Sequence, residues 1–119
     1  VLADKLLPKL GSEANHIVDS IRNPSEVNSL KEKSPLRKFF LISVDANARL
    51  RYDRLCSRGR VGDSNSWEMF VEQERQEDTN DDPSKQQLSK TMSMADYSID
   101  NSGTLDELEE HVKKIISNL

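Results

Sequence analysis

A short apolar run in the middle of the chain, residues 39–42, most constrains what this sequence can fold into. It reads Phe-Phe-Leu-Ile, and Val44 extends it before Asp45 introduces a charge. Consecutive bulky apolar residues cover both faces of a strand, as in the central strands of parallel sheets, whereas a half-exposed strand alternates apolar with polar residues. We therefore expect a strand over residues 38–44 that is buried on both of its faces.

Strand-like and helix-like segments alternate along the rest of the chain. The patterns predict two further strands, over residues 16–21 and 97–99. They predict helices over residues 1–10, 24–33, 47–57, 67–77, 86–94 and 105–119. Strands that alternate with helices argue for an α/β fold with a parallel sheet, and right-handed crossovers would place helices on both faces of that sheet.

Capping residues mark several of the predicted helix ends. Asn23 before Pro24 is typical of a helix start, because an amide oxygen caps the first turn and proline suits the first helical position. Gly59 predicts the end of the helix over 47–57, and Thr104 with Glu107 forms a capping box before the last helix. On the helix over 47–57, the periodicity turns the charged residues outward, namely Arg49, Arg51, Asp53 and Arg54.

Composition excludes several classes of function. The chain has 119 residues, which suits one domain, and it is 34% hydrophobic and 32% charged. Its net charge of -4 makes it a poor candidate for binding a phosphate backbone, so we expect no nucleic-acid partner. The apolar run at 39–42 is too short to span a membrane, so we expect no membrane partner.

Cysteine and histidine usage bounds the chemistry further. Cys56 is the only cysteine, so no intrachain disulfide can form, which fits a reducing compartment such as the cytoplasm. His16 and His111 are the only histidines and lie far apart in sequence. The chain therefore does not contain the ligand spacing of a zinc site, and we expect no bound structural metal.

A carboxylate and a guanidinium stand where the first predicted strand ends. Asp19 could hold a magnesium ion or its waters, and Arg22 could clamp a phosphate through two hydrogen bonds. The alternative is an ion pair that only orders the turn from strand to helix.

Two further segments carry candidate residues. Arg58, Arg60 and Arg75 flank a polar segment and could close over a polyphosphate, although basic residues at a helix end are also favoured by the helix dipole alone. Residues 101–103 read Asn-Ser-Gly between a strand and a helix, where backbone groups could contact a base or an anion. The alternative for this segment is a plain strand-to-helix connection.

Three segments in this order resemble P-loop nucleotide kinases related to adenylate and dephospho-CoA kinases. Residues 18–27 resemble the family's "DGIR-x-x-x-E-V" segment, and residues 95–105 are similar to its "ADY-x-I-x-N-x-G-T-L" signature. Residues 40–46, 51–55 and 58–60 look like the family's fourth strand, the helix after it and the start of the mobile lid. The same set resembles the kinase-like domain that precedes the zinc deaminase module of fungal deoxycytidylate deaminases.

The resemblance implies an incomplete P-loop kinase-like three-layer α/β domain over residues 1–119, with a short parallel sheet flanked by helices and a lid-like helical insertion over 59–94. It implies binding of ATP and Mg²⁺ in the intact parent and phosphoryl transfer to a nucleotide or similar acceptor. The residues it implies are Asp19, Arg58 and Arg60 for catalysis, Arg22, Asn23 and Arg75 for substrate binding, and Asn101, Ser102 and Gly103 for the nucleotide base.

One part of the family pattern is missing from the sequence. There is no G-x-x-x-x-G-K-[ST], and in the family's sheet order the strand before that loop lies between the strands at Ile17 and Leu41. We expect that the chain is a fragment, that an upstream segment or a second chain supplies the strand, or that the sheet is rearranged. In each case we expect poor phosphoryl transfer by this chain alone, because phosphate positioning dominates that catalysis. The alternative function is a non-catalytic nucleotide-sensing or assembly domain attached to a deoxycytidylate deaminase.

Overall fold

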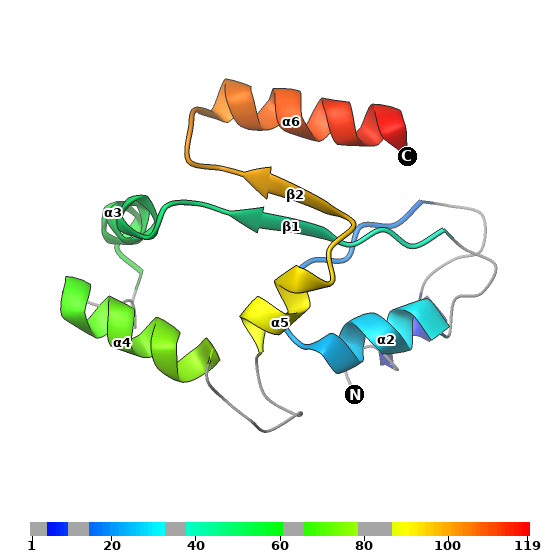
Figure 1. Cartoon of the computed structure of the whole chain (residues 1–119), viewed down its shortest axis with the longest axis horizontal. Coiled ribbons are helices and arrows are strands. Elements are labelled where there is room, and N and C mark those ends of the chain that lie inside the picture. Colours follow the sequence, from blue (N-terminus) through cyan, green and yellow to red (C-terminus); the bar gives the residue numbers. More distant parts are fainter. Residues whose placement is uncertain (1–4, 10–14, 33–37, 61–65, 79–86) are drawn as a thin grey trace. The chain divides into compact units, whose positions relative to one another are not determined.

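The computed structural model describes residues 5–9, 15–32, 38–60, 66–78 and 87–119, and these form a mixed α/β structure (Figure 1). Two short parallel strands are accompanied by helices, so the predicted α/β class is confirmed at this level. By their internal contacts the described residues fall into two compact units. Unit 1 lies within Val1–Leu41 and Glu77–Ala95, and unit 2 lies within Ile42–Gln76 and Asp96–Leu119.

The sheet belongs to unit 2 and consists of β1 (Ile42–Asp45) and β2 (Tyr97–Asp100). The strands are parallel, as predicted, and their register pairs Ile42 with Tyr97 and Asp45 with Asp100. Asp45 and Asp100 are the last residues of the two strands and pair with each other, so both strands end in an aspartate at the same edge of the sheet.

The prediction that the strand after residue 38 is buried on both faces is wrong. β1 begins only at Ile42, which is 39% exposed, and Val44 is 54% exposed, while Leu41 and Ser43 are buried. In the described part of the sheet, β1 pairs with β2 alone, and the helix that packs on the sheet packs against β2. Burial of the apolar run therefore depends on neighbours that its own sequence does not specify.

Unit 1 is built around helix α2 (Pro24–Glu32), against which the short helix α5 (Leu88–Ser93) packs (Figure 1). Its buried side chains include Val27 and Leu30 of α2 and Thr91 of α5. The backbone N–H of Gln87 donates to the carbonyl of Arg22 at 2.9 Å, so the residue before α5 is tied to the start of α2.

The start of α2 follows the prediction. The Asn23 side-chain oxygen accepts a hydrogen bond from the Ser25 N–H at 2.8 Å, and Pro24 occupies the first helical position. The Glu26 carboxylate accepts from the Arg22 N–H at 3.2 Å, which satisfies a further donor near the helix start.

The predicted strand over residues 16–21 is wrong. These residues form no strand, and Ile17 is 98% exposed. Ser20 has a φ of 62°, a left-handed conformation that an extended strand cannot contain. The segment has the apolar residues of a strand, but it does not pair with either of the two described strands.

Helices α3 (Ala48–Arg58) and α6 (Leu105–Asn118) of unit 2 have the predicted ends. Asn47 caps α3, and Gly59 ends it in a left-handed conformation with a φ of 56°. Thr104 and Glu107 form the predicted capping box of α6, which packs against β2. No helix in the described ranges offers an apolar stretch that would cross a lipid bilayer.

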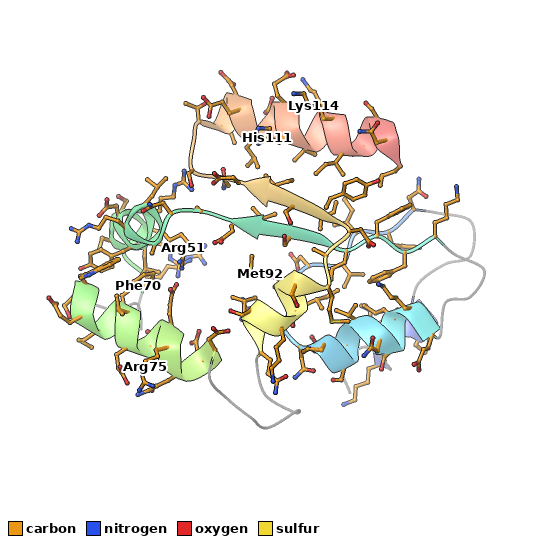
Figure 2. All side chains as sticks on the ribbon, viewed as in Figure 1. Arg51, Phe70, Arg75, Met92, His111 and Lys114 are labelled. Atoms are coloured by element: carbon orange, nitrogen blue, oxygen red, sulfur yellow. The ribbon has the colours of Figure 1, made fainter. Side chains whose placement is uncertain are left out.

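Helix α4 (Trp67–Asp78) contacts α3 through aromatic rings in unit 2. The ring centroid of Tyr52 lies 5.7 Å from that of Trp67 and 5.5 Å from that of Phe70. The Arg51 guanidinium lies over the Phe70 ring at 5.7 Å (Figure 2). Phe70 is 8% exposed and is the buried residue of α4.

The remaining helical predictions are met in part. Residues 5–6 are helical and η1 (Leu7–Lys9) is a 3₁₀ helix, and the rest of the helix predicted over 1–10 lies outside the described residues. The helices α4 and α5 lie within the insertion predicted over 59–94, although α5 is shorter than the predicted helix over 86–94. That this insertion acts as a lid in a single domain stays a prediction.

Candidate functional site

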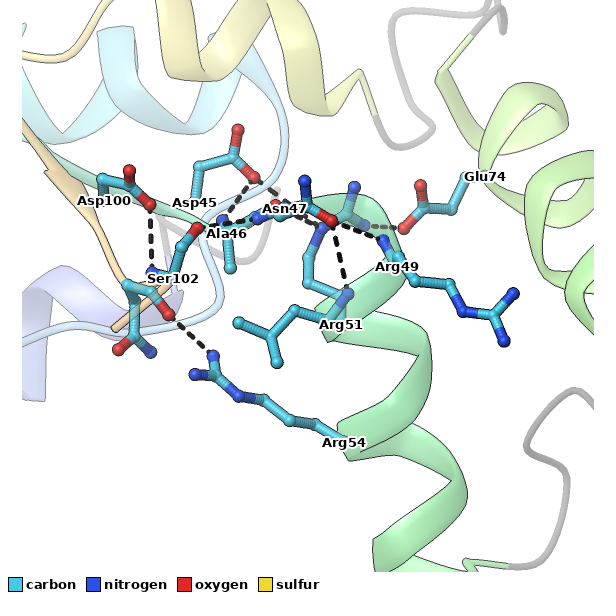
Figure 3. Close-up of polar contacts among 11 residues, drawn as sticks. Asp45, Ala46, Asn47, Arg49, Arg51, Arg54, Glu74, Asp100 and Ser102 are labelled. Carbon is cyan, nitrogen blue, oxygen red and sulfur yellow. Dashed lines mark hydrogen bonds and ion pairs between the residues drawn. The ribbon is translucent and has the colours of Figure 1, made fainter. Parts of the chain in front are cut away.

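The candidate site lies where β1 and β2 end, at the carboxyl edge of the parallel sheet (Figure 3). In α/β folds with parallel sheets, ligands bind outside this edge, on the loops that lead from strands into helices. Here one such loop, residues 46–47, leads into α3, and the other, residues 101–104, leads into α6. We call residues 101–104 the edge loop.

Hydrogen bonds hold these two loops side by side. The Asn101 N–H donates to the Asp45 carbonyl at 2.6 Å, and the Asn47 N–H donates to the Ser102 hydroxyl oxygen at 2.9 Å. The edge loop is thus attached to the end of β1 and to the capping residue of α3.

Arg54 of α3 also contacts the edge loop (Figure 3). One guanidinium nitrogen donates to the Asn101 carbonyl at 2.7 Å, and the other donates to the Gly103 carbonyl at 3.2 Å. A planar guanidinium can make such a pair of bonds at once, whereas a lysine ammonium has no matching fork.

Arg51, one turn earlier on α3, connects the other loop to α4. Its Nε donates to the Ala46 carbonyl at 2.9 Å and lies 3.8 Å from the Asp45 carboxylate. Its Nη1 forms an ion pair with the Glu74 carboxylate. The sheet edge, α3 and the neighbouring part of α4 are therefore linked through one half-buried arginine.

The charge at this edge is shared between carboxylates and arginines. Hydrogen bonds from the Ser102 hydroxyl and its backbone N–H hold the pKa of Asp100 below its ordinary value, and nearby His111 lowers it further. Asp100 therefore stays ionised at neutral pH, beside Asp45 at the end of β1. Two carboxylates disfavour a phosphate directly at this point, whereas an uncharged base with its own donors would be tolerated.

A preformed metal site is not visible in the described part of the chain. Among those residues, His, Cys, Asp and Glu side chains do not gather in a group of three or more that could hold a metal ion. Asp45 and Asp100 alone supply too few ligands for an ion that prefers six oxygens.

The predicted base-contacting residues, Asn101, Ser102 and Gly103, follow β2 and lie at this edge. The predicted Arg58 is the last residue of α3, and Arg60 follows the capping Gly59, with both side chains exposed.

The third predicted lid arginine, Arg75, is paired with Glu72 one turn earlier on α4. Arg75 Nε donates to one Glu72 oxygen at 3.0 Å, and Nη2 donates to the other at 2.7 Å. Hydrogen bonds from Arg75, and then from Gln76, hold the pKa of Glu72 below its ordinary value, while Glu72 raises the pKa of Arg75. The pair is well exposed, so a phosphate could compete for the guanidinium at small cost.

The other predicted residues, Asp19, Arg22 and Asn23, lie in unit 1. Asp19 and Arg22 have exposed side chains directly before α2. Asn23 is 7% exposed, and its side-chain oxygen accepts bonds from the Ser25 N–H and hydroxyl. Its visible role is therefore to cap α2, and its predicted part in substrate binding stays a prediction.

Sequence reasoning missed the roles of Arg51 and Arg54, for which it predicted only an outward orientation. Arg54 is exposed as predicted and Arg51 is half-buried, but both side chains donate to backbone carbonyls at the sheet edge. The signal was their spacing of three residues on a helix that starts at the carboxyl end of a predicted strand. That spacing places both guanidinium groups on one side of the helix.

Comparison with known proteins gives relatives but no activity. No protein-family model matches the chain. It is 34% identical to a UPF0200 protein of Hyperthermus butylicus, over 100% of this chain and 60% of that protein. It is 32% identical to a UPF0200 protein of Methanococcus maripaludis, over 92% of this chain and 57% of that protein. A UPF0200 protein of Thermococcus kodakarensis is 29% identical, over 87% of this chain and 52% of that protein. The chain thus spans about half the length of the curated relatives it matches.

Proposed function

We propose that this chain is part of a nucleotide-binding, P-loop kinase-like domain whose intact parent transfers a phosphoryl group from ATP to a nucleotide or a similar acceptor. One observation carries the proposal. The parallel pairing of β1 with β2 brings the edge loop, which bears the "N-x-G-T-L" part of the family signature, beside the start of α3. This is the edge at which α/β enzymes bind nucleotides.

The pairing also agrees with the sheet order of the resembled family. In that order, the strand missing from this sequence lies between the segment at Ile17 and the strand at Leu41. In that order the strand at Tyr97 is the remaining neighbour of the strand at Leu41, and β2 does pair with β1. The proposal also gives a reason why residues 16–21 form no strand, because their neighbour in the family would be the missing strand.

Backbone conformation at Ser20 supports the proposal independently. Ser20 stands at the glycine of the family's "DGIR" segment, and its φ of 62° is one that glycine adopts at little cost. If the backbone of this segment follows the same path as in the family, a serine at the position of the family's glycine is expected to adopt this conformation.

Charge then divides the proposed site into two sides. The edge loop, next to Asp45 and Asp100, suits the base, whereas the exposed arginines Arg58, Arg60 and Arg75 suit the phosphates. Arg22, predicted to contact the acceptor, and Asp19, predicted to act near the phosphates, belong to unit 1, and their roles stay predictions.

ATP and Mg²⁺ are the cofactors that this function implies. The described residues do not by themselves provide a set of Mg²⁺ ligands. Mg²⁺ often keeps several waters and is held largely by substrate phosphates, so the proposal assigns this ion no protein-bound position.

Calorimetric titration of the chain with ATP and with deoxynucleoside triphosphates tests the proposal. The double variant Arg58→Ala, Arg60→Ala should weaken binding about a hundredfold, since two charge-assisted bonds to phosphate are lost and each contributes about 1.5 kcal/mol. Lys113→Ala, Lys114→Ala is the matched control, because it removes the same charge from exposed positions on α6. Binding that is equal in both double variants would refute the assignment of the arginines, and absence of nucleotide binding by the wild type would refute the function.

A further inference from the structure

The edge loop has few means of keeping its shape. Ser102, Gly103 and Thr104 are exposed, and Asn101 is half-buried, so the loop is not anchored by a buried apolar side chain. Its order rests on hydrogen bonds. Besides the short-range bonds from the Ser102 N–H to Asp100 and from the Thr104 N–H to Glu107, these are the bond from Asn101 to β1, the bond from Asn47 to Ser102 and the two bonds from Arg54.

Arg54 differs from the other attachments because it spans the loop. The two carbonyls that it binds belong to Asn101 and Gly103, on either side of Ser102. A single rigid group bonded to residues two apart limits rotation of the peptide groups between them. Each of the other attachments involves one residue of the loop, so among the described bonds only those from Arg54 join two loop residues through one group.

The charged guanidinium of Arg54 also makes both of its described hydrogen bonds with the edge loop. Both of its described donor groups point at loop carbonyls. A guanidinium that neutralises carbonyl dipoles on one side of a loop leaves the opposite side to contact a ligand.

We infer that Arg54 is a positioning residue that fixes the edge loop for contact with a nucleotide base. This inference rests on the proposed function for its ligand, whereas the part that concerns the order of the loop rests on the described hydrogen bonds and not on that function. Arg54 acts through the loop backbone and is not assigned any contact with the phosphates.

Amide hydrogen exchange tests whether Arg54 orders the loop. The backbone N–H groups of Asn101, Ser102 and Thr104 are hydrogen-bonded, although none of them to Arg54, so they report on loop opening. In Arg54→Ala we expect these amides to exchange about tenfold faster, because two charge-assisted bonds are lost. The amide of Val112, in the middle of α6 and away from the edge loop, and the variant Lys113→Ala should show wild-type rates.

Titration with a nucleoside triphosphate and with inorganic tripolyphosphate tests the link to the base. Arg54→Ala should weaken binding of the nucleotide about tenfold and leave binding of tripolyphosphate unchanged, because a loosened loop affects base contacts only. Arg54→Lys should recover part of both effects, since an ammonium can reach one carbonyl but cannot bridge two. It also provides a readout if the alanine variant does not fold.

These experiments distinguish failure of the inference about Arg54 from failure of the proposed function. Unchanged exchange in Arg54→Ala would overturn the inference, and so would an equal loss of affinity for both ligands, which would mark Arg54 as a phosphate contact. If the wild type binds neither ligand, the proposed function fails, and the exchange comparison alone then accepts or rejects the role of Arg54 in ordering the loop.

Discussion

Ser20 is notable for its backbone conformation and not for contacts of its side chain. It is the non-glycine residue with a positive φ in the part of the chain that the structure describes. A serine in this conformation is strained by contact between its Cβ and the following carbonyl, and glycine avoids that contact. The substitution Ser20→Gly therefore probes the local path directly.

Ser20→Gly should raise the free energy of unfolding by about 0.5–1 kcal/mol, since relief of strain exceeds the entropy that glycine adds to the unfolded chain. Ser29→Gly within α2 is the control and should lower the same free energy by about 0.5 kcal/mol. Urea denaturation followed by far-UV circular dichroism measures both. Destabilisation by Ser20→Gly would show that Ser20 is held by its side chain instead.

Asp100 is the residue whose ionisation reports on the edge loop. Its pKa in the folded chain lies below the ordinary value because the Ser102 hydroxyl and N–H stabilise the charged form, with a further contribution from His111. A depressed folded pKa contributes stability that is present above the ordinary pKa and is lost as the pH falls through the folded pKa.

Ser102→Ala should raise the pKa of Asp100 toward its ordinary value without reaching it, because the backbone N–H of residue 102 remains. Carbon-detected NMR titration of the carboxyl group measures the shift, with Ser57→Ala on the exposed side of α3 as the control. The loss of stability that Asp100 causes on acidification should then be smaller in Ser102→Ala and be complete at a higher pH than in the control. Identical titration of Asp100 in both variants would show that the hydroxyl does not stabilise its charge.

At the scale of elements, capping residues and periodicity near each helix were enough to predict the helices. Whether a segment forms a buried strand depended on contacts with distant parts of the chain. The caps at Asn47, Gly59 and Thr104 lie within a few residues of the ends they determine, so the sequence contains their chemistry. A strand at 16–21 would need a neighbouring strand from another part of the chain. Burial of Val44 would need another element packed on its face of the sheet, and the apolar run itself does not determine that element. Both failures therefore have the same cause.

The contact between α3 and α4 is the element-scale feature that sequence reasoning saw only in part. The helix over 67–77 was predicted, but the partners of its Phe70, Tyr52 and Arg51, come from a helix whose charged residues were predicted to face outward. Long arginine side chains can cover a ring and still reach polar partners, which a simple inward or outward assignment does not describe.

Phe70→Ala should lower the free energy of unfolding of this region by about 3 kcal/mol, the usual cost of removing a buried aromatic ring. Val71→Ala is the control on the same helix, because Val71 is exposed, and it should cost much less. Urea denaturation followed by fluorescence of Trp67, the single tryptophan, measures both, since its ring centroid lies 5.7 Å from that of Phe70. Equal effects of the two substitutions would mean that the aromatic cluster does not hold α4 to α3.

At the scale of the whole molecule, the residues predicted for one site are divided between the two units. The edge loop and the arginines Arg58, Arg60 and Arg75 are in unit 2, whereas Asp19 and Arg22 are in unit 1. Motif order along the chain predicted these residues as a set, but order along a chain does not determine how separate compact units combine. The grouping around the edge loop is the part of the site that the structure bears on.

Phosphoryl transfer tests the proposal for the whole chain. The sequence contains no G-x-x-x-x-G-K-[ST], and backbone donors of that loop, together with its lysine, position the phosphates in the resembled family. We therefore expect the 119-residue chain to bind nucleotide through the edge loop and the arginines but to release no ADP when given ATP and nucleoside monophosphates. A coupled assay of ADP release, with an active nucleoside monophosphate kinase as its positive control, measures this. ADP release that is proportional to the concentration of the chain and disappears in Arg58→Ala, Arg60→Ala would contradict the expectation, because it would place phosphate positioning in residues of this chain.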